Sequence, residues 1–143
     1  MDIVEVPFNQ KLGVRRSREG EPGLLALDGS TDNLNHLGTL HAGAQLALAE
    51  AASGESLLCQ AGLNPETVVA VVRRVEAKFR NPLKGAIFAG PARNQLGLAE
   101  ALAGLDAQGR AVLPVAVEVT DERHFVGLTA TFEWFVQRKA PAG

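Results

Sequence analysis

Residues 42–52, with the sequence AGAQLALAEAA, constrain the fold of this chain more than any other segment. Ala and Leu are strong helix formers, so the segment reads as a helix, and it has almost no polar face. Glu50 is its lone acid. A helix that is apolar all round is normally buried on most of its sides. In a chain of 143 residues, the simplest cover for this helix is a sheet that curves around it.

Segments of alternating apolar and polar residues supply such a sheet. The clearest alternation runs through residues 126–137, and similar patterns occupy residues 67–80 and 111–119. Period-two patterns of this kind are typical of half-buried antiparallel strands. Further strands are expected at residues 3–14, 24–28 and 86–89, with Pro7 placing part of the first at a sheet edge or a bulge.

Two helices are expected between these strands. The long apolar helix should cover residues 40–53, because Gly54 is a natural C-terminal stop. A second, shorter helix is expected at residues 94–108. One buried helix with antiparallel strands is an α+β arrangement.

Length and composition predict a single domain spanning residues 1–143. The net charge of −2 and the lack of a dense basic run give nucleic-acid binding no electrostatic support. The chain has neither a signal-peptide pattern nor the roughly 18 consecutive apolar residues that span a bilayer. Its single cysteine, Cys59, fits a reducing compartment. We therefore expect a cytoplasmic protein with no membrane or nucleic-acid partner.

Three polar residues stand at fixed spacing around the start of the long helix. Asn35 lies six residues before His41, and Glu50 lies nine residues after it. The first N–H groups of a helix have no intrahelical partners and attract negative charge. A carboxylate among Ala and Leu is poorly solvated, so its pKa should rise toward that of a useful base or nucleophile. Together these features outline an acyl-transfer site.

With these residues, the chain resembles the hotdog-fold acyl-CoA thioesterases, and most closely the phenylacetate-pathway and 4-hydroxybenzoyl-CoA type. In that family the helix opens with His-Gly-Gly, carries Asp or Glu nine positions after the His, and follows an Asn or Gln six positions before it. Here Ala42 replaces the first Gly. That position acts through its backbone N–H, which Ala retains.

The resemblance implies a role for each site residue. The N–H of Ala42, helped by that of Gly43, would stabilise the oxyanion, and Asn35 would donate to the same oxygen or hold the loop. Glu50 would attack as a nucleophile or activate water as a general base, and the sequence does not separate the two. His41 would orient the loop or bind near the thioester sulfur. By looser analogy, Thr67 would position water.

The spacing of Ala42 and Glu50 predicts a dimer. Eight residues of one helix place them about 12 Å apart along its axis. A carbonyl oxygen and its carbon are bonded neighbours, so donor and carboxylate must each come within about 3 Å of adjacent atoms. Two antiparallel helices across a two-fold axis satisfy this condition easily, and one helix does not. We expect an obligate homodimer with two shared sites, as the resemblance also implies, and leave open its pairing into a tetramer.

Coenzyme A would enter as part of the substrate, with no separate cofactor. Its phosphates need cations, and Arg80, Lys84 and Arg93 bracket the turn and strand that follow residues 67–80, with Arg123 and His124 as rivals. No metal is expected, because His36 and His41 lack a neighbouring Cys or carboxylate. The acyl chain, and whether coenzyme A or an acyl carrier protein carries it, stay open.

Two other functions compete with the thioesterase hypothesis. The alternative is a non-catalytic acyl-CoA or lipid-binding hotdog dimer, which gains weight if Ala42 distorts the site. A hotdog dehydratase or hydratase is disfavoured, because its Asp-x-Asn-Pro-x-His or His-x-x-x-Pro-Gly pattern is missing from the sequence. A Gly-x-Ser-x-Gly hydrolase motif is missing as well.

Overall fold

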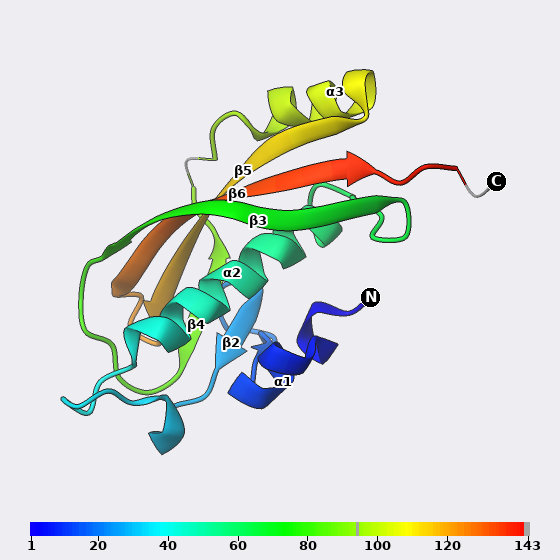
Figure 1. Ribbon diagram of the computed structural model, residues 1–143. Helices are drawn as coiled ribbons and strands as arrows, with labels where there is room; N and C mark the ends of the chain where they lie inside the picture. Colours follow the sequence, from blue (N-terminus) through cyan, green and yellow to red (C-terminus); the bar gives the residue numbers. More distant parts are fainter. Residues whose placement is uncertain (94, 142–143) are drawn as a thin grey trace.

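A long helix with a curved antiparallel sheet around it dominates the computed structural model, which describes residues 1–93 and 95–141 (Figure 1). The helix, α2, spans Ala42–Cys59. Within the described residues the sheet has six strands in the order β1-β2-β4-β5-β6-β3, and all neighbours are antiparallel. The strands are β1 Arg15–Arg16, β2 Leu25–Leu27, β3 Val68–Phe79, β4 Ile87–Pro91, β5 Arg110–Asp121 and β6 Val126–Arg138. The predicted α+β class and curved sheet are confirmed.

Helix α2 is buried against the concave face of the sheet, mainly over β4 and β5. Its residues Leu48, Ala49, Ala51 and Ala52 have no exposed surface. The residues of β5 that face it are equally buried: Leu113, Val115, Val117 and Val119. Small alanine side chains allow the strands to approach the helix axis closely, so the apolar composition of α2 is explained by burial, as the sequence predicts.

The strand expected at residues 3–14 is wrong. This segment forms a short 3-10 helix, η1 (Ile3–Glu5), followed by helix α1 (Pro7–Leu12). Pro7 occupies the first helical position, where its fixed φ is favourable and its missing N–H costs nothing. Gly13 ends the helix in the left-handed region, with a φ of 91°. Pro7, which was expected to mark a sheet edge or a bulge, instead begins a helix, and the segment packs beside α2.

The long helix also runs further than expected, because Gly54 lies inside it. A Cβ at Gly54 would lie 3.3 Å from Ile3 Cδ1 and 3.4 Å from Trp134 Cζ2. The glycine therefore serves close packing on both sides and is not a C-terminal stop. The second helix, α3, spans Leu98–Gln108 and starts later than predicted, while Asn94, its expected first residue, lies outside the described residues.

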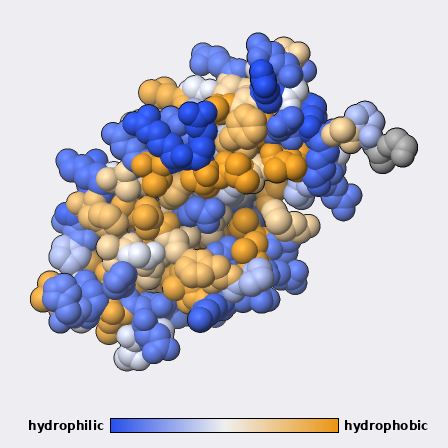
Figure 2. All heavy atoms as spheres, viewed as in Figure 1, coloured by the Kyte–Doolittle hydropathy of each residue, from blue (hydrophilic) through white to orange (hydrophobic). Residues whose placement is uncertain are grey.

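Strand β3 lies at the edge of the sheet, and part of its inner face is uncovered. It pairs with β6, and the register shifts between Val72 and Arg74. After this shift Val75 and Phe79 lie opposite buried residues of β6, on the same face as predicted. They are nevertheless 41% and 49% exposed. Figure 2 shows the resulting band of apolar side chains over β3 and the adjacent part of α2.

In the part of the chain that the structure describes, no helix combines the length and the apolar character needed to cross a membrane.

Candidate active site

The loop before α2 is held together by the side chain of Asn35. Its Oδ1 accepts the N–H groups of Leu37 at 2.9 Å and Thr39 at 3.1 Å. Its Nδ2 donates to Thr39 Oγ1 at 2.8 Å. Asn35 was expected either to donate to the oxyanion or to hold the loop, and these contacts hold the loop. The loop in turn fixes where the chain enters the helix.

His41 caps the N-terminus of α2. Its N–H donates to the Asn33 carbonyl at 2.8 Å, and its Nδ1 accepts the Gly43 N–H at 2.8 Å. Leu40 donates to the Leu83 carbonyl at 2.9 Å, which ties the helix entry to the β3–β4 loop. The Gly43 N–H is therefore engaged by His41 in this structure. Among the described residues the Ala42 N–H has no hydrogen-bond acceptor, which leaves it available to an incoming oxyanion.

Glu50 lies two turns along α2 on a stripe that the sheet does not cover. Residues 42, 43, 46, 47 and 50 are all exposed or partly exposed, at the three- and four-residue spacing of one helix face. We call this stripe the open face of α2. Within the described residues the Glu50 carboxylate makes neither a hydrogen bond nor an ion pair, and partial burial raises the pKa of its carboxyl above the ordinary value. The Ala42 N–H and the Glu50 carboxylate thus share one uncovered surface.

Two buried side chains fix the turn of α2 that carries Glu50. Ser53 Oγ donates to the Glu50 carbonyl at 2.6 Å and accepts the Trp134 Nε1–H at 2.9 Å. Sequence reasoning did not single out Ser53 or Trp134. Two features of the sequence could have identified them: a hydroxyl residue inside an apolar helix and a tryptophan on the inward face of a strand. A buried indole N–H usually needs an acceptor, and the hydroxyl can supply it.

Thr67 is not brought near Glu50 within one subunit. It lies after the C-terminal end of α2, where its Oγ1 donates to the Asn64 carbonyl at 3.1 Å. It borders a pocket with Leu63, Asp106 and Arg138. Thr67 therefore makes its contacts near the C-terminal end of α2 and not beside Glu50.

The predicted phosphate-binding cations are distributed over three places. Lys84 is exposed and follows Leu83, so it stands beside the entry to α2. Arg80 is exposed on the outer side of the sheet and donates from Nε to Thr129 Oγ1 at 3.1 Å. Arg93 and the rival His124 line a third location, an open pocket of about 400 Å³ on the outer face of β4 and β5.

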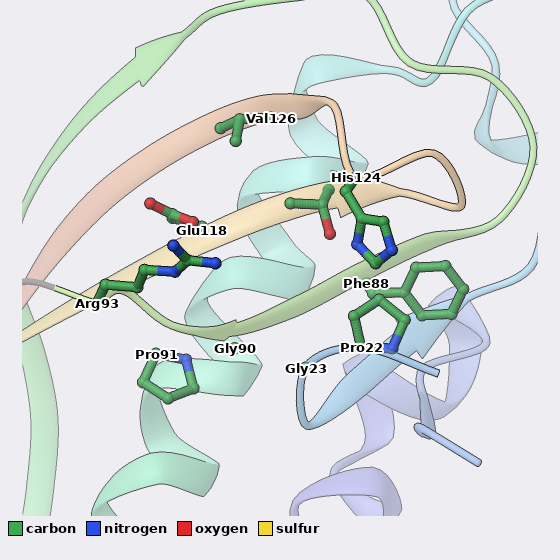
Figure 3. A pocket seen from close by; sticks show the side chains of 10 residues that line it. Pro22, Gly23, Phe88, Gly90, Pro91, Arg93, Glu118, His124 and Val126 are labelled. Carbon is green, nitrogen blue, oxygen red and sulfur yellow. The ribbon is translucent and has the colours of Figure 1, made fainter. Parts of the chain in front are cut away.

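That outer pocket carries charges of both signs. Figure 3 shows the Arg93 guanidinium pointing toward Glu118, with His124 over Pro22 at the other end. A carboxylate beside Arg93 partly offsets its attraction for a phosphate. Arg80 likewise shares an open outer pocket with Glu76, so of the predicted cations it is Lys84 that stands beside the entry to α2. Among the described residues, no group of three or more His, Cys, Asp or Glu side chains gathers as metal ligands would.

The sequence model of one protein family, described as a domain of unknown function (DUF4442), matches residues 19–136. The chain belongs to the DUF4442 family. The matched range includes the loop, the whole of α2 and most of β6. Among curated proteins, none matches the chain.

Solved structures share the fold of this DUF4442 member. PA5026 from Pseudomonas aeruginosa, a protein of unknown function described as a probable thioesterase, superposes with a TM-score of 0.76 at 25% identity over 96% of this chain and 91% of that one. A glutamine-to-alanine mutant of the thioesterase PA1618 from the same organism gives 0.69 at 19%, over 95% and 89%.

SAV0944 from Staphylococcus aureus, described as a thioesterase enzyme, is a more distant structural match at 11% identity. Two mutants of it superpose with TM-scores of 0.62 and 0.63, over 91% and 92% of this chain and 98% and 99% of those. One replaces a glutamine at position 32 and the other a glutamate at position 47 of that protein. Together with the topology, these similarities confirm the hotdog fold for this chain.

Proposed function

We propose that this protein is an acyl-CoA thioesterase that acts as a homodimer. One observation carries the proposal. A carboxylate without a partner among the described residues and a free N–H at the helix N-terminus share the open face of α2. A structural carboxylate in such apolar surroundings would normally be paired, because leaving it unpaired costs stability. Thioester hydrolysis needs both a base or nucleophile and an oxyanion donor.

The names and mutants of structural neighbours support this reaction. PA1618 and SAV0944 are called thioesterases, and PA5026 a probable one. The glutamine and glutamate replaced in SAV0944 lie fifteen positions apart. Asn35 and Glu50 have the same separation in this chain. An amide followed after that interval by a glutamate is thus common to both proteins.

The proposed dimer follows from the uncovered surfaces. A second copy with its α2 antiparallel to the first would place Ala42 of the partner subunit opposite Glu50. The same copy would cover Val75 and Phe79, the exposed apolar residues on the inner face of β3. An edge strand with exposed apolar side chains and unpaired backbone groups is normally protected by a neighbour.

In the proposed mechanism, the Ala42 N–H of one subunit donates to the thioester carbonyl oxygen. Glu50 of the other subunit takes a proton from water while the water oxygen bonds to the carbonyl carbon. The tetrahedral intermediate then collapses, the C–S bond breaks, and the thiolate of coenzyme A takes up the proton from Glu50. In the nucleophilic variant, the Glu50 carboxylate itself displaces the thiolate, and water hydrolyses the resulting anhydride. A raised pKa favours the proton-transfer role.

The other predicted site residues fit around this chemistry. We assign the phosphates of coenzyme A to Lys84, with weaker contributions from Arg80 and Arg93, which share outer pockets with Glu76 and Glu118. His41 and Asn35 act by fixing the loop and the helix entry. Gly43 would contribute its N–H only if His41 released it. Thr67 has no role here unless a partner subunit approaches it.

The activity test is thiol release from a panel of short, medium and aryl acyl-CoAs. We expect the wild type to hydrolyse part of the panel and Glu50→Ala to lose at least about 10²-fold in kcat. Glu100→Ala, an exposed acid on α3, is the matched control and should keep wild-type activity. Binding of acyl-CoA without turnover by the wild type would instead favour a non-catalytic acyl-CoA-binding dimer.

The dimer test compares two substitutions on the same strand. Val75→Arg places a charge on the inner face of β3, and Val69→Arg places one at a 52% exposed position on the outer face. Light scattering after size exclusion should show a dimer for the wild type and Val69→Arg, and a monomer without activity for Val75→Arg. An active monomeric wild type would overturn the shared site.

A further inference from the structure

An apolar pocket lies along α2, just beyond Glu50. It has a volume of about 170 Å³ and opens between the C-terminal half of α2, the start of β3 and the N-terminal segment. All of its lining side chains are uncharged, and the one charge on these residues is the N-terminal ammonium of Met1; they are Met1, Ile3, Gly54, Leu57, Leu58, Leu63, Pro65, Val68, Ala70 and Trp134. This lining contrasts with the outer pocket of Figure 3, which holds Arg93 and Glu118.

The pocket begins one helical turn from the proposed reaction centre. Gly54 follows Glu50 by four residues, so the two lie on the same side of α2 about 6 Å apart along its axis. Leu58, another lining residue, lies one further turn along the same side of α2. A thioester carbon held at Glu50 would therefore have its acyl group within reach of this pocket.

Gly54 determines how much of the pocket is available. A Cβ at this position would lie 3.3 Å from Ile3 Cδ1, 3.4 Å from Trp134 Cζ2 and 3.5 Å from Trp134 Cη2. A methyl group there would have to displace Ile3 or the indole edge, and because both line the pocket, the displacement would narrow it. The indole N–H is already donated to Ser53, so the ring offers apolar contact to an occupant.

We propose that this pocket receives the acyl group, and that Gly54 is the residue that sets the size of the acyl group accepted. The inference rests on the proposed thioesterase function and adds its substrate class. An apolar cavity of about 150 Å³ holds one benzene molecule. The pocket therefore fits one unsubstituted ring or a short branched chain, and excludes a long fatty acyl chain. An acyl group with a carboxylate or hydroxyl at its end is disfavoured, because no side chain of the lining carries a charge.

The test measures kcat/KM for acetyl-, isovaleryl-, benzoyl- and decanoyl-CoA with wild type, Gly54→Ala and Leu58→Ala. We expect the wild type to prefer isovaleryl and benzoyl groups. Gly54→Ala should lose about tenfold on benzoyl-CoA and stay within about twofold on acetyl-CoA, since one methyl group in an apolar pocket changes specificity by roughly that factor. Alanine also favours a helix interior, so this variant should fold.

Leu58→Ala provides the opposite change, because it enlarges the pocket. It should raise the decanoyl-to-benzoyl ratio of kcat/KM about tenfold. If neither variant changes the ratios between substrates, the pocket does not hold the acyl group, even though the thioesterase function stands. If the wild type hydrolyses none of the four substrates, the proposed function itself fails. Circular dichroism and thermal unfolding establish that each variant is folded.

Discussion

Two glutamates on the same helix, five residues apart, have opposite surroundings. Glu55 is buried, with an ion pair to Arg16, and its Oε1 accepts the Cys59 thiol at 3.0 Å. This contact also raises the pKa of the Cys59 thiol. Glu50 is less buried, yet its carboxylate has neither kind of partner among the described residues. The more deeply buried acid is thus paired within the fold, and the less buried one is not paired within the described residues.

The two halves of α2 also differ in whether their polar groups have partners. In the second half, polar side chains are paired internally, as Ser53 is with Trp134 and Ser56 with Gln60. In the first half, the open face carries the Ala42 N–H and Glu50 without protein partners in the described residues. The comparison teaches that pairing, and not depth, separates a structural carboxylate from a candidate catalytic one on this helix.

The largest expected effect separates the two acids by activity. Glu50→Gln should lower kcat by about 10² to 10⁴, because the base or nucleophile is removed while the shape is kept. Glu55→Gln should keep kcat within about tenfold, since its contacts are all structural. Steady-state thiol release with the best acyl-CoA of the panel measures both. Equal losses in the two variants would remove the distinction between them.

The next largest effect is a loss of unfolding free energy when Glu55 loses its ion-pair partner Arg16. Arg16→Met leaves the buried Glu55 carboxylate without its cation, and we expect unfolding free energy to fall by about 2–3 kcal/mol. The half-exposed position of Arg16 keeps the loss below that of a fully buried pair. Urea denaturation at neutral pH measures the change. Arg18→Met, at an exposed neighbouring position, is the control and should stay within about 0.5 kcal/mol.

A smaller effect is expected at the hydroxyl that supports Glu50. Ser53→Ala leaves the buried Trp134 N–H without its acceptor, which should cost about 1–2 kcal/mol in urea denaturation. Ser56→Ala removes only the bond to the exposed Gln60 side chain, and should cost about 0.5 kcal/mol. A larger loss for Ser56→Ala than for Ser53→Ala would mean that the indole contact is not the stabilising one.

The smallest effect is the pH dependence that the raised pKa of Glu50 contributes. Burial raises the pKa of its carboxyl above the ordinary 4.5, so the folded state favours the neutral form. The stability that Glu50 contributes is therefore present in acid and is lost as pH rises through its folded pKa. Activity, which needs the carboxylate, should fall on the acid side of that same pKa.

Glu50→Gln tests both consequences by urea denaturation and kinetics at several pH values. The variant should be more stable than the wild type at pH 8, and the difference should shrink toward pH 4. A difference that does not vary with pH would mean that Glu50 titrates as it does in the unfolded chain.

Much of this fold was predictable from local pattern. The alternation in residues 111–119 and 126–137 and the apolar composition of α2 are properties of single segments, and the sheet and helix follow from them. The spacing of Asn35, His41 and Glu50 is equally local. The N-terminal helices were not predicted, because Pro7 is compatible with a sheet edge as well as with the first position of a helix.

The contacts that support the site were not predictable, because they join distant parts of the chain. Arg16 and Glu55 are 39 residues apart, and Ser53 and Trp134 are 81 apart. Gly54 was read as a helix stop because its packing against Ile3 and Trp134 is visible only in three dimensions.

The uncovered inner face of β3 has a consequence for how the protein behaves on dilution. If a second copy covers Val75 and Phe79 as proposed, association and folding are linked by mass action. The melting temperature would then rise with protein concentration, and a dilute sample would hold subunits whose edge strand is open to non-native pairing. Handling at low concentration would thus deplete the active species and promote aggregation.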